Sequence, residues 1–241
     1  MILFGRKSGK WLPGMGLLLA LAAFLSLAAC ATRTAVTDRP VPYAQTARME
    51  NTGQILLVTE ESFLFLTARK IYPLEKTDSS WRQAMKPIEA VIGRNGFAPP
   101  GEKREGDGCT PSGVFRLKTA FGYPPSVPTQ MPYRQSQDDD LWIDDPNDPE
   151  YNRLVRENQT KAASYERMKR DDDLYKYGIA IEYNTEPVIK GLGSAIFLHV
   201  WRGANSATAG CVAASEDDIL KILGWLNPVK NPVMLINPDE P

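Results

Sequence analysis

One stretch of 19 residues, from Ile196 to Ala214, constrains this chain more than any other, because it holds the only histidine and a cysteine 12 positions downstream. The run from Ile196 to Trp201 is apolar, β-branched and aromatic, which predicts a buried strand carrying His199 on a rigid element. The segment from Gly203 to Ala209 is typical of a loop that returns the chain to Gly210-Cys211. The sequence therefore predicts a strand, a return loop and a cysteine held near the histidine.

Such a pair suits acyl transfer. A thiol attacks a carbonyl only as its thiolate, and an imidazole is one of the few groups that accepts the thiol proton near neutral pH. The same residues also fit a structural role, because a lone histidine is commonly a hydrogen-bonded core residue and a lone cysteine a small hydrophobe. Spacing alone leaves both interpretations open.

The residue identities in two motifs are more informative than the spacing between His199 and Cys211. Thr208-Ala-Gly-Cys-Val212, preceded by a strand ending in His199, resembles the signature of the L,D-transpeptidase catalytic-domain family, in which a histidine precedes a Ser/Thr-x-Gly-Cys block. Taken alone, the stretch from Gly106 to Leu117 predicts the start of a hairpin. Its Gly106-Asp-Gly-Cys-Thr-Pro-Ser-Gly-Val-Phe115 block is also similar to one found upstream of the catalytic strand in a branch of that family. The resemblance covers roughly residues 53 to 237.

The resemblance implies a β-rich α+β fold: a β-sandwich with a helix after the catalytic cysteine and a helical or loop insertion. It implies that Cys211 is the nucleophile, His199 the general base and the backbone of Gly210 an oxyanion donor. Thr208, Trp201 and Arg202 become candidate substrate-binding residues. The expected substrate is a peptidoglycan tetrapeptide stem, which would form a thioester and pass to an amine of a neighbouring stem, with no metal or cofactor.

The chain departs from the family pattern at Ala209, Ala213 and Ala214, where many members have a second histidine and an Asn or Arg. The base must then be His199. Val200 cannot orient the imidazole with its side chain, so we expect a backbone carbonyl, from the loop between Trp201 and Ser206, to do so. A hydrolytic carboxypeptidase or endopeptidase would use the same residues with water as acceptor. A non-enzymatic wall-binding lipoprotein is the third alternative.

The first 30 residues have a basic start and an apolar run that ends in Leu27-Ala-Ala-Cys30. This pattern predicts a secretory signal that resembles a bacterial lipobox, with Cys30 as the lipidated first residue of the mature chain. An uncleaved anchor, or simple cleavage near Ala29, is the alternative. Residues 31–52 read as a flexible tether and residues 53–241 as the catalytic domain. The expected location is the periplasm, with the lipid on Cys30 in the outer membrane, given a Gram-negative host.

Strands are predicted where short apolar or alternating runs are bounded by turn residues. These runs are 54–60, 62–70, 87–93, 114–117, 177–183 and 232–237. Glu60-Glu61 separates the first two, which suit a hairpin. After Cys211, Ser215-Glu-Asp-Asp218 predicts a helix start with acidic side chains in its first turn. The apolar face of that helix comprises Ile219, Ile222, Leu223 and Leu226.

The segment 138–173 is acidic and polar, and it predicts solvated loops with one or two short helices. Its acidic clusters lack the Asp-x-Asp-x-Asp-Gly spacing of a calcium loop, which argues against a metal site. The chain has 28 basic and 29 acidic side chains and no basic stripe, so nucleic acid is not an expected partner. Cys109 is expected to be an unpaired, partly shielded thiol, with a reversible bridge to Cys211 left open.

Overall fold

The computed structural model describes residues 49, 51–64, 66–78 and 80–238. The predicted signal segment with Cys30, and most of the predicted tether, lie outside these residues. The chain divides into two units, Met1–Thr34 and Ala35–Pro241, and the fold below belongs to the second. Within the described residues, no helix is long and apolar enough to cross a membrane.

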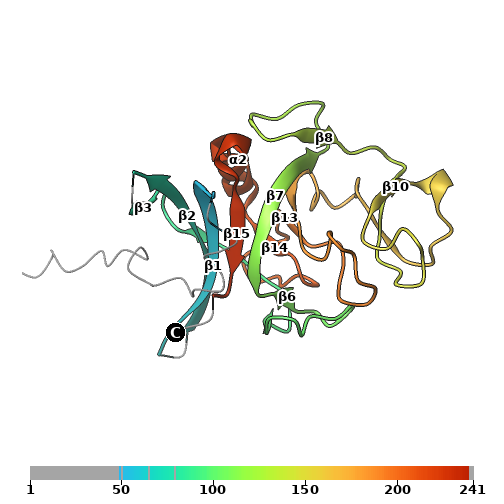
Figure 1. Ribbon diagram of the computed structural model, residues 1–241, viewed down its shortest axis with the longest axis horizontal. Coiled ribbons are helices and arrows are strands. Elements are labelled where there is room, and N and C mark those ends of the chain that lie inside the picture. Colours follow the sequence, from blue (N-terminus) through green and yellow to red (C-terminus); the bar gives the residue numbers. More distant parts are fainter. Residues whose placement is uncertain (1–48, 50, 65, 79, 239–241) are drawn as a thin grey trace, which may run out of the picture. The chain divides into compact units, whose positions relative to one another are not determined.

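A ten-stranded sheet forms the centre of the fold, in the order β14-β13-β12-β7-β15-β1-β2-β3, with β4 paired to β2 and β8 to β7 (Figure 1). Its strands are β1 (Gln54–Phe63), β2 (Leu66–Thr77), β3 (Ser80–Gln83), β4 (Ile88–Glu89), β7 (Gly113–Gly122), β8 (Tyr133–Gln135), β12 (Tyr177–Ile181), β13 (Phe197–Val200), β14 (Val212–Ala214) and β15 (Val233–Ile236). A two-stranded sheet pairs β5 (Phe97–Ala98) with β6 (Thr110–Pro111). Most predicted strands are present, but the run 87–93 forms only β4 and two isolated bridges, and the run 62–70 spans the end of β1 and the start of β2.

The sheet is buried on both faces, as the apolar run in β1 shows. Successive side chains of a strand point to opposite faces, so Leu56 and Val58 enter one apolar cluster while Ile55 and Leu57 enter another. All four are at most 6% exposed. A sheet that buries both faces explains why this strand reads as continuously apolar and not as alternating.

The predicted hairpin exists, but its turn is not at Glu60-Glu61. Both glutamates lie inside β1, where Glu60 is opposite Arg69 of β2 in the register. Glu60 forms an ion pair with Arg69 at 2.8 Å, and Glu61 forms one with Lys70 at 3.0 Å. Because cross-strand ion pairs accommodate charge within an exposed strand end, the acidic pair did not mark a turn.

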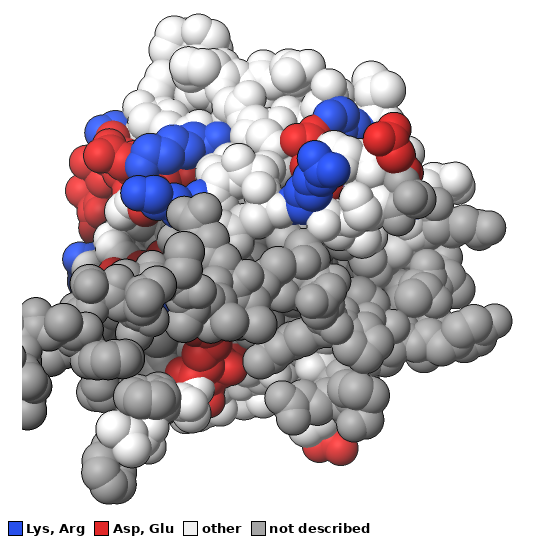
Figure 2. Space-filling model, turned by 90° about the vertical axis from the view of Figure 1, so that its left-hand side faces the viewer, with Lys and Arg blue, Asp and Glu red and all other residues white. Residues whose placement is uncertain are grey.

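Charges of both signs also gather on the surface. On the face shown in Figure 2, Lys and Arg side chains lie next to Asp and Glu side chains in small groups, separated by uncharged surface. The described residues visible on this face therefore form no extended patch of one sign.

Helix α2 (Glu216–Trp225) begins and packs as the sequence predicts. The Ser215 hydroxyl accepts a hydrogen bond from the N–H of Asp218 at 3.2 Å, which caps the first turn. Ile219, Ile222 and Leu223 are fully buried, and the helix packs against β12 and β13. Burial of each such side chain contributes about 1.5–3 kcal/mol, so α2 fixes the strands that carry the candidate site.

The insertion at 138–173 differs from the predicted loops and helices. It forms a three-stranded sheet, β10-β9-β11, from β9 (Asp140–Ile143), β10 (Leu154–Arg156) and β11 (Tyr165–Arg167). Its helical content is one 3₁₀ turn, Glu157–Gln159, and a second 3₁₀ turn, Pro228–Lys230, follows α2. The insertion is held by aromatic packing, because Trp142 lies edge to face with Phe197 of β13, their ring centroids 5.0 Å apart.

Candidate active site

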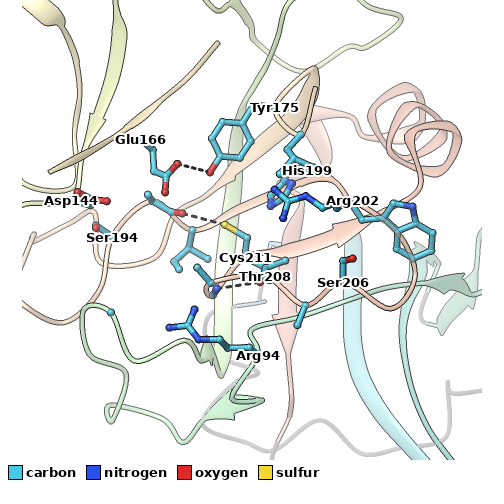
Figure 3. A pocket seen from close by; sticks show the side chains of 18 of the residues that line it. Arg94, Asp144, Glu166, Tyr175, Ser194, His199, Arg202, Ser206, Thr208 and Cys211 are labelled. Atoms are coloured by element: carbon cyan, nitrogen blue, oxygen red, sulfur yellow. Dashed lines mark hydrogen bonds between the residues drawn. The ribbon is translucent and has the colours of Figure 1, made fainter. Parts of the chain in front are cut away.

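Strand pairing brings His199 and Cys211 together. β13 and β14 are parallel neighbours, with His199 opposite Ala213, so Cys211 lies just before the strand next to the histidine. Both residues line one pocket of about 390 Å³ (Figure 3). The predicted strand, loop and cysteine therefore form a common site.

The thiol of Cys211 is buried and hydrogen-bonded to the backbone. Its Sγ donates to the carbonyl oxygen of Ala195 at 3.3 Å and accepts from the N–H of Phe197 at 3.4 Å. Burial raises the pKa of Cys211 to about 12, and the Phe197 N–H offsets only part of this effect. Cys211 is a neutral thiol at neutral pH.

The imidazole of His199 is equally enclosed. Its Nδ1 lies 2.7 Å from the carbonyl oxygen of Val200, which assigns the ring proton to Nδ1 and leaves the lone pair on Nε2. Burial lowers the pKa of His199 to about 4, against the opposing effect of the Val200 and Leu174 carbonyls. A backbone carbonyl orients the ring, as expected, but it belongs to Val200 and not to the predicted loop.

The two candidate groups are neutral and apart in this structure. Among the described residues, the hydrogen bonds of the Cys211 thiol go to Ala195 and Phe197, and none joins it to His199. The thiol donates to the Ala195 carbonyl, and Figure 3 shows His199 on another side of the cysteine. Proton transfer to Nε2 therefore requires the thiol to turn away from Ala195.

The carbonyl that holds the thiol is itself positioned by the insertion. Ala195 has φ +52°, a left-handed conformation that costs a non-glycine residue about 1–2 kcal/mol. Its N–H donates to Oδ1 of Asn152 at 3.1 Å, and Trp142 Nε1 donates to the same oxygen at 2.9 Å. The Asn152 amide nitrogen donates to the carbonyls of Tyr183 and Asn184. The buried Asn152 side chain thus ties the insertion to the residues just before β13.

The turn before Cys211 uses two of the predicted site residues internally. Thr208 Oγ1 donates to the carbonyl of Cys211 at 2.7 Å and accepts from the N–H of Gly210 at 3.1 Å. A Cβ at position 210 would lie 3.0 Å from the carbonyl oxygen of Cys109, so this close approach requires glycine. An oxyanion would compete with Thr208 for the Gly210 N–H, and the predicted roles of Gly210 and Thr208 stay predictions.

Trp201 and Arg202, the other predicted substrate-binding residues, line the same pocket. Trp201 is half-buried, and its N–H donates to the carbonyl of Ala214 at 2.8 Å. Arg202 is exposed and pairs with Asp172 at 3.3 Å. Their positions suit contact with a ligand, and their roles also stay predictions.

The sequence interpretation missed the wall that the insertion contributes. Glu166 accepts hydrogen bonds from Tyr175 Oη at 3.3 Å and from Arg170 at 3.0 Å, and burial raises its pKa. Asp144 also lines the pocket, with a raised pKa caused by burial and with a buried Oδ1 that has no partner among the described residues. Asp144 directly follows the apolar run Leu141-Trp-Ile143, a signal for a residue at the end of a buried strand.

Cys109 lies close to this site without joining it. Both described cysteines are free, and Cys109 is half-buried, in agreement with the expected unpaired, partly shielded thiol. Its Sγ lies 3.6 Å from the carbonyl oxygen of Asn95. The Gly106–Phe115 block therefore contributes backbone to the site through the contact of Cys109 with Gly210.

The fold and site define a class: a β-rich domain whose pocket pairs a cysteine at the start of one strand with a histidine on its parallel neighbour. Comparison with protein families matches residues 66–235 to YkuD, the L,D-transpeptidase catalytic domain. The chain belongs to this family, as its two motifs indicated. No curated protein and no solved structure matches the chain. Membership supports peptidoglycan L,D-transpeptidase-type activity and peptide stems as substrates.

Proposed function

We propose that the protein is a peptidoglycan L,D-transpeptidase in which Cys211 forms a thioester with a tetrapeptide stem and passes it to an amine. One observation carries the proposal: within the matched domain, the Cys211 thiol and the basic Nε2 of His199 border one pocket. A nucleophile and a base on rigid neighbouring strands are the requirement for this chemistry.

In the acylation step, His199 Nε2 takes the proton of Cys211 as Sγ attacks the carbonyl carbon that precedes the terminal D-alanine. The C=O electron pair moves to oxygen and forms a tetrahedral oxyanion. When the C–N bond breaks, the imidazolium returns the proton to the nitrogen of the released D-alanine. The stem remains as a thioester on Cys211.

The pKa values of Cys211 and His199 indicate that proton transfer between them depends on bound substrate. Burial raises the pKa of the thiol and lowers that of the imidazole, so both shifts disfavour a thiolate–imidazolium pair in the free enzyme. Proton transfer accompanies attack, after the thiol leaves the Ala195 carbonyl.

In the second step an amine from a neighbouring stem attacks the thioester carbonyl, and His199 accepts the proton of that amine. The C–S bond breaks, and the imidazolium returns the proton to Sγ, which regenerates the thiol. Water in place of the amine gives the hydrolytic carboxypeptidase or endopeptidase reaction. The same pocket serves both, and the acceptor decides the product.

The test is incubation of the full chain with tetrapeptide-bearing muropeptides, followed by mass spectrometry of the products. A cross-linked dimer with release of D-alanine supports the transpeptidase, whereas tripeptide stems alone support the hydrolase and contradict transfer. Binding without any product assigns the chain to the wall-binding class. Cys109→Ser is the matched control, because it removes a neighbouring thiol and is expected to retain full activity.

We further propose that the chain is a periplasmic lipoprotein, anchored in the outer membrane through Cys30. Support comes from Leu27-Ala-Ala-Cys30 at the end of an apolar run. Labelled palmitate should enter the protein in cells and be lost in Cys30→Ser. Label that persists in this variant contradicts the anchor and leaves the enzymatic proposal untouched.

A further inference from the structure

The basic side chains that line the pocket differ in whether they form ion pairs with carboxylates. Four basic side chains line it: Arg94, Lys103, Arg170 and Arg202. Three of them are neutralised by nearby carboxylates, through the ion pairs Lys103–Asp107 at 2.7 Å, Arg170–Glu166 at 3.0 Å and Arg202–Asp172 at 3.3 Å. Arg94 has neither an ion pair nor a side-chain hydrogen bond with any residue that the structure describes. Its guanidinium is the lining cation left available to a ligand.

Arg94 is also placed by the two motifs that build the site. Its N–H donates to the carbonyl of Thr208 at 2.9 Å, in the turn that leads to Cys211. The guanidinium rests on Gly108, where a Cβ would lie 2.9 Å from Arg94 Cζ. Gly108 has φ +71°, so both its backbone conformation and the room for this side chain favour glycine. The cation is therefore attached to the same wall as the nucleophile.

The wall opposite Arg94 carries carboxylates. In the view of Figure 3, Cys211 lies between Arg94 and the carboxylates Glu166 and Asp144. A third lining carboxylate, Glu105, accepts hydrogen bonds from the hydroxyls of Tyr151 and Ser194. The carboxylates are thus engaged elsewhere or lie across the pocket from Arg94.

We propose that Arg94 binds the terminal carboxylate of the donor stem, on the residue released in acylation. The inference rests on the proposed function and deepens it. A guanidinium offers a planar fork of donors that matches a carboxylate, and this carboxylate is the one next to the scissile bond. Binding it from the wall that carries Cys211 would align the scissile carbonyl with the thiol and select stems with a free carboxyl terminus.

The experiment measures binding to Cys211→Ala, which cannot consume its ligand. Two tetrapeptide stems are compared by calorimetry, one with a free terminal carboxylate and one with a terminal carboxamide. The free acid should bind about tenfold more tightly than the amide, as a charge-assisted hydrogen bond at a partly exposed site predicts. Adding Arg94→Ala should abolish this preference, and Arg94→Lys should retain part of it because it keeps the charge without the fork.

Arg82→Ala is the matched control, since Arg82 is an exposed arginine on β3, at the other end of the sheet from β13 and β14. The acid preference should persist in this variant. Equal binding of acid and amide with Arg94 intact, or a preference that survives Arg94→Ala, overturns the inference alone. If neither stem binds, the proposed function fails, and the inference fails with it.

Discussion

The two walls of the pocket hold their ionisable groups in different ways. On the strand wall, Cys211 and His199 are buried among backbone and apolar groups, and burial moves both pKa values in the direction that keeps them neutral. On the insertion wall, Glu166 and Arg170 are half-buried and form an ion pair at 3.0 Å, and Asp172 pairs with the same arginine at 2.8 Å. The strand wall thus holds its reactive groups in their neutral forms, whereas the insertion wall holds charged groups in ion pairs.

Activation of the Cys211–His199 pair must therefore come from the substrate. In a low-dielectric site the neutral forms of Cys211 and His199 are favoured. Proton transfer between them therefore depends on a bound ligand that supplies charge or excludes water. The paired charges of the insertion wall need no such event. The experiments below perturb each wall, beginning with the largest expected effect.

Cys211→Ala and His199→Ala should each lower turnover of a tetrapeptide muropeptide by more than about 10³-fold, because each removes a partner in bond formation or proton transfer. Both variants should unfold cooperatively, measured by circular dichroism. A His199→Ala protein with near wild-type rate would require another base and would end the dyad account.

The pH dependence of stability should reveal the neutral histidine. The unfolded chain binds a proton at His199 below about pH 6.5, whereas the folded protein resists protonation until about pH 4. Stability from this group is complete above pH 6.5 and should fall by up to about 3 kcal/mol as pH drops through that window. His199→Gln should lose this component.

The measurement is denaturant unfolding of both proteins between pH 7 and 4. Glu166 and Asp144 have raised pKa values and act in the opposite sense, but they are present in both proteins, so the difference isolates the histidine. Because the chain has one histidine, parallel curves would show that His199 is not held neutral by burial.

Substitutions on the insertion wall should change the stability less, and by different amounts at Glu166 and Asp144. Glu166→Gln should cost about 1–2 kcal/mol of unfolding free energy, because it weakens the contacts with Arg170 and Tyr175. Asp144→Asn should change stability by less than about 0.5 kcal/mol, since it replaces a carboxylate whose buried oxygen has no partner. Equal losses in the two variants would remove the distinction between them.

Much of the strand wall was predictable from sequence because local patterns encode it. The run around His199 predicted β13, and Ser215 with its acidic first turn predicted α2. Patterns failed where pairing across the fold decides the outcome. Glu60 and Glu61 looked like a turn but lie within β1, where they form ion pairs with Arg69 and Lys70 of β2.

The insertion wall was not predicted from the sequence, for the same reason. Charge runs are usually solvated, so Asp140 and Asp144 were expected at the surface. Asp140 is instead 1% exposed and paired with Arg134 at 2.6 Å, while Asp144 borders the pocket. No local pattern distinguishes a paired guanidinium from that of Arg94, which pairs with no described residue, because pairing depends on residues distant in sequence.

Covalent trapping tests whether Cys211 becomes acylated with help from His199. Carbapenems, which acylate members of this family, should add one adduct to the full chain, and peptide mapping by mass spectrometry should place it on Cys211. Cys109→Ser should be labelled like the wild type, whereas Cys211→Ala should not be labelled and His199→Ala should be labelled far more slowly. An adduct on Cys109, or equal labelling with and without His199, would contradict the account.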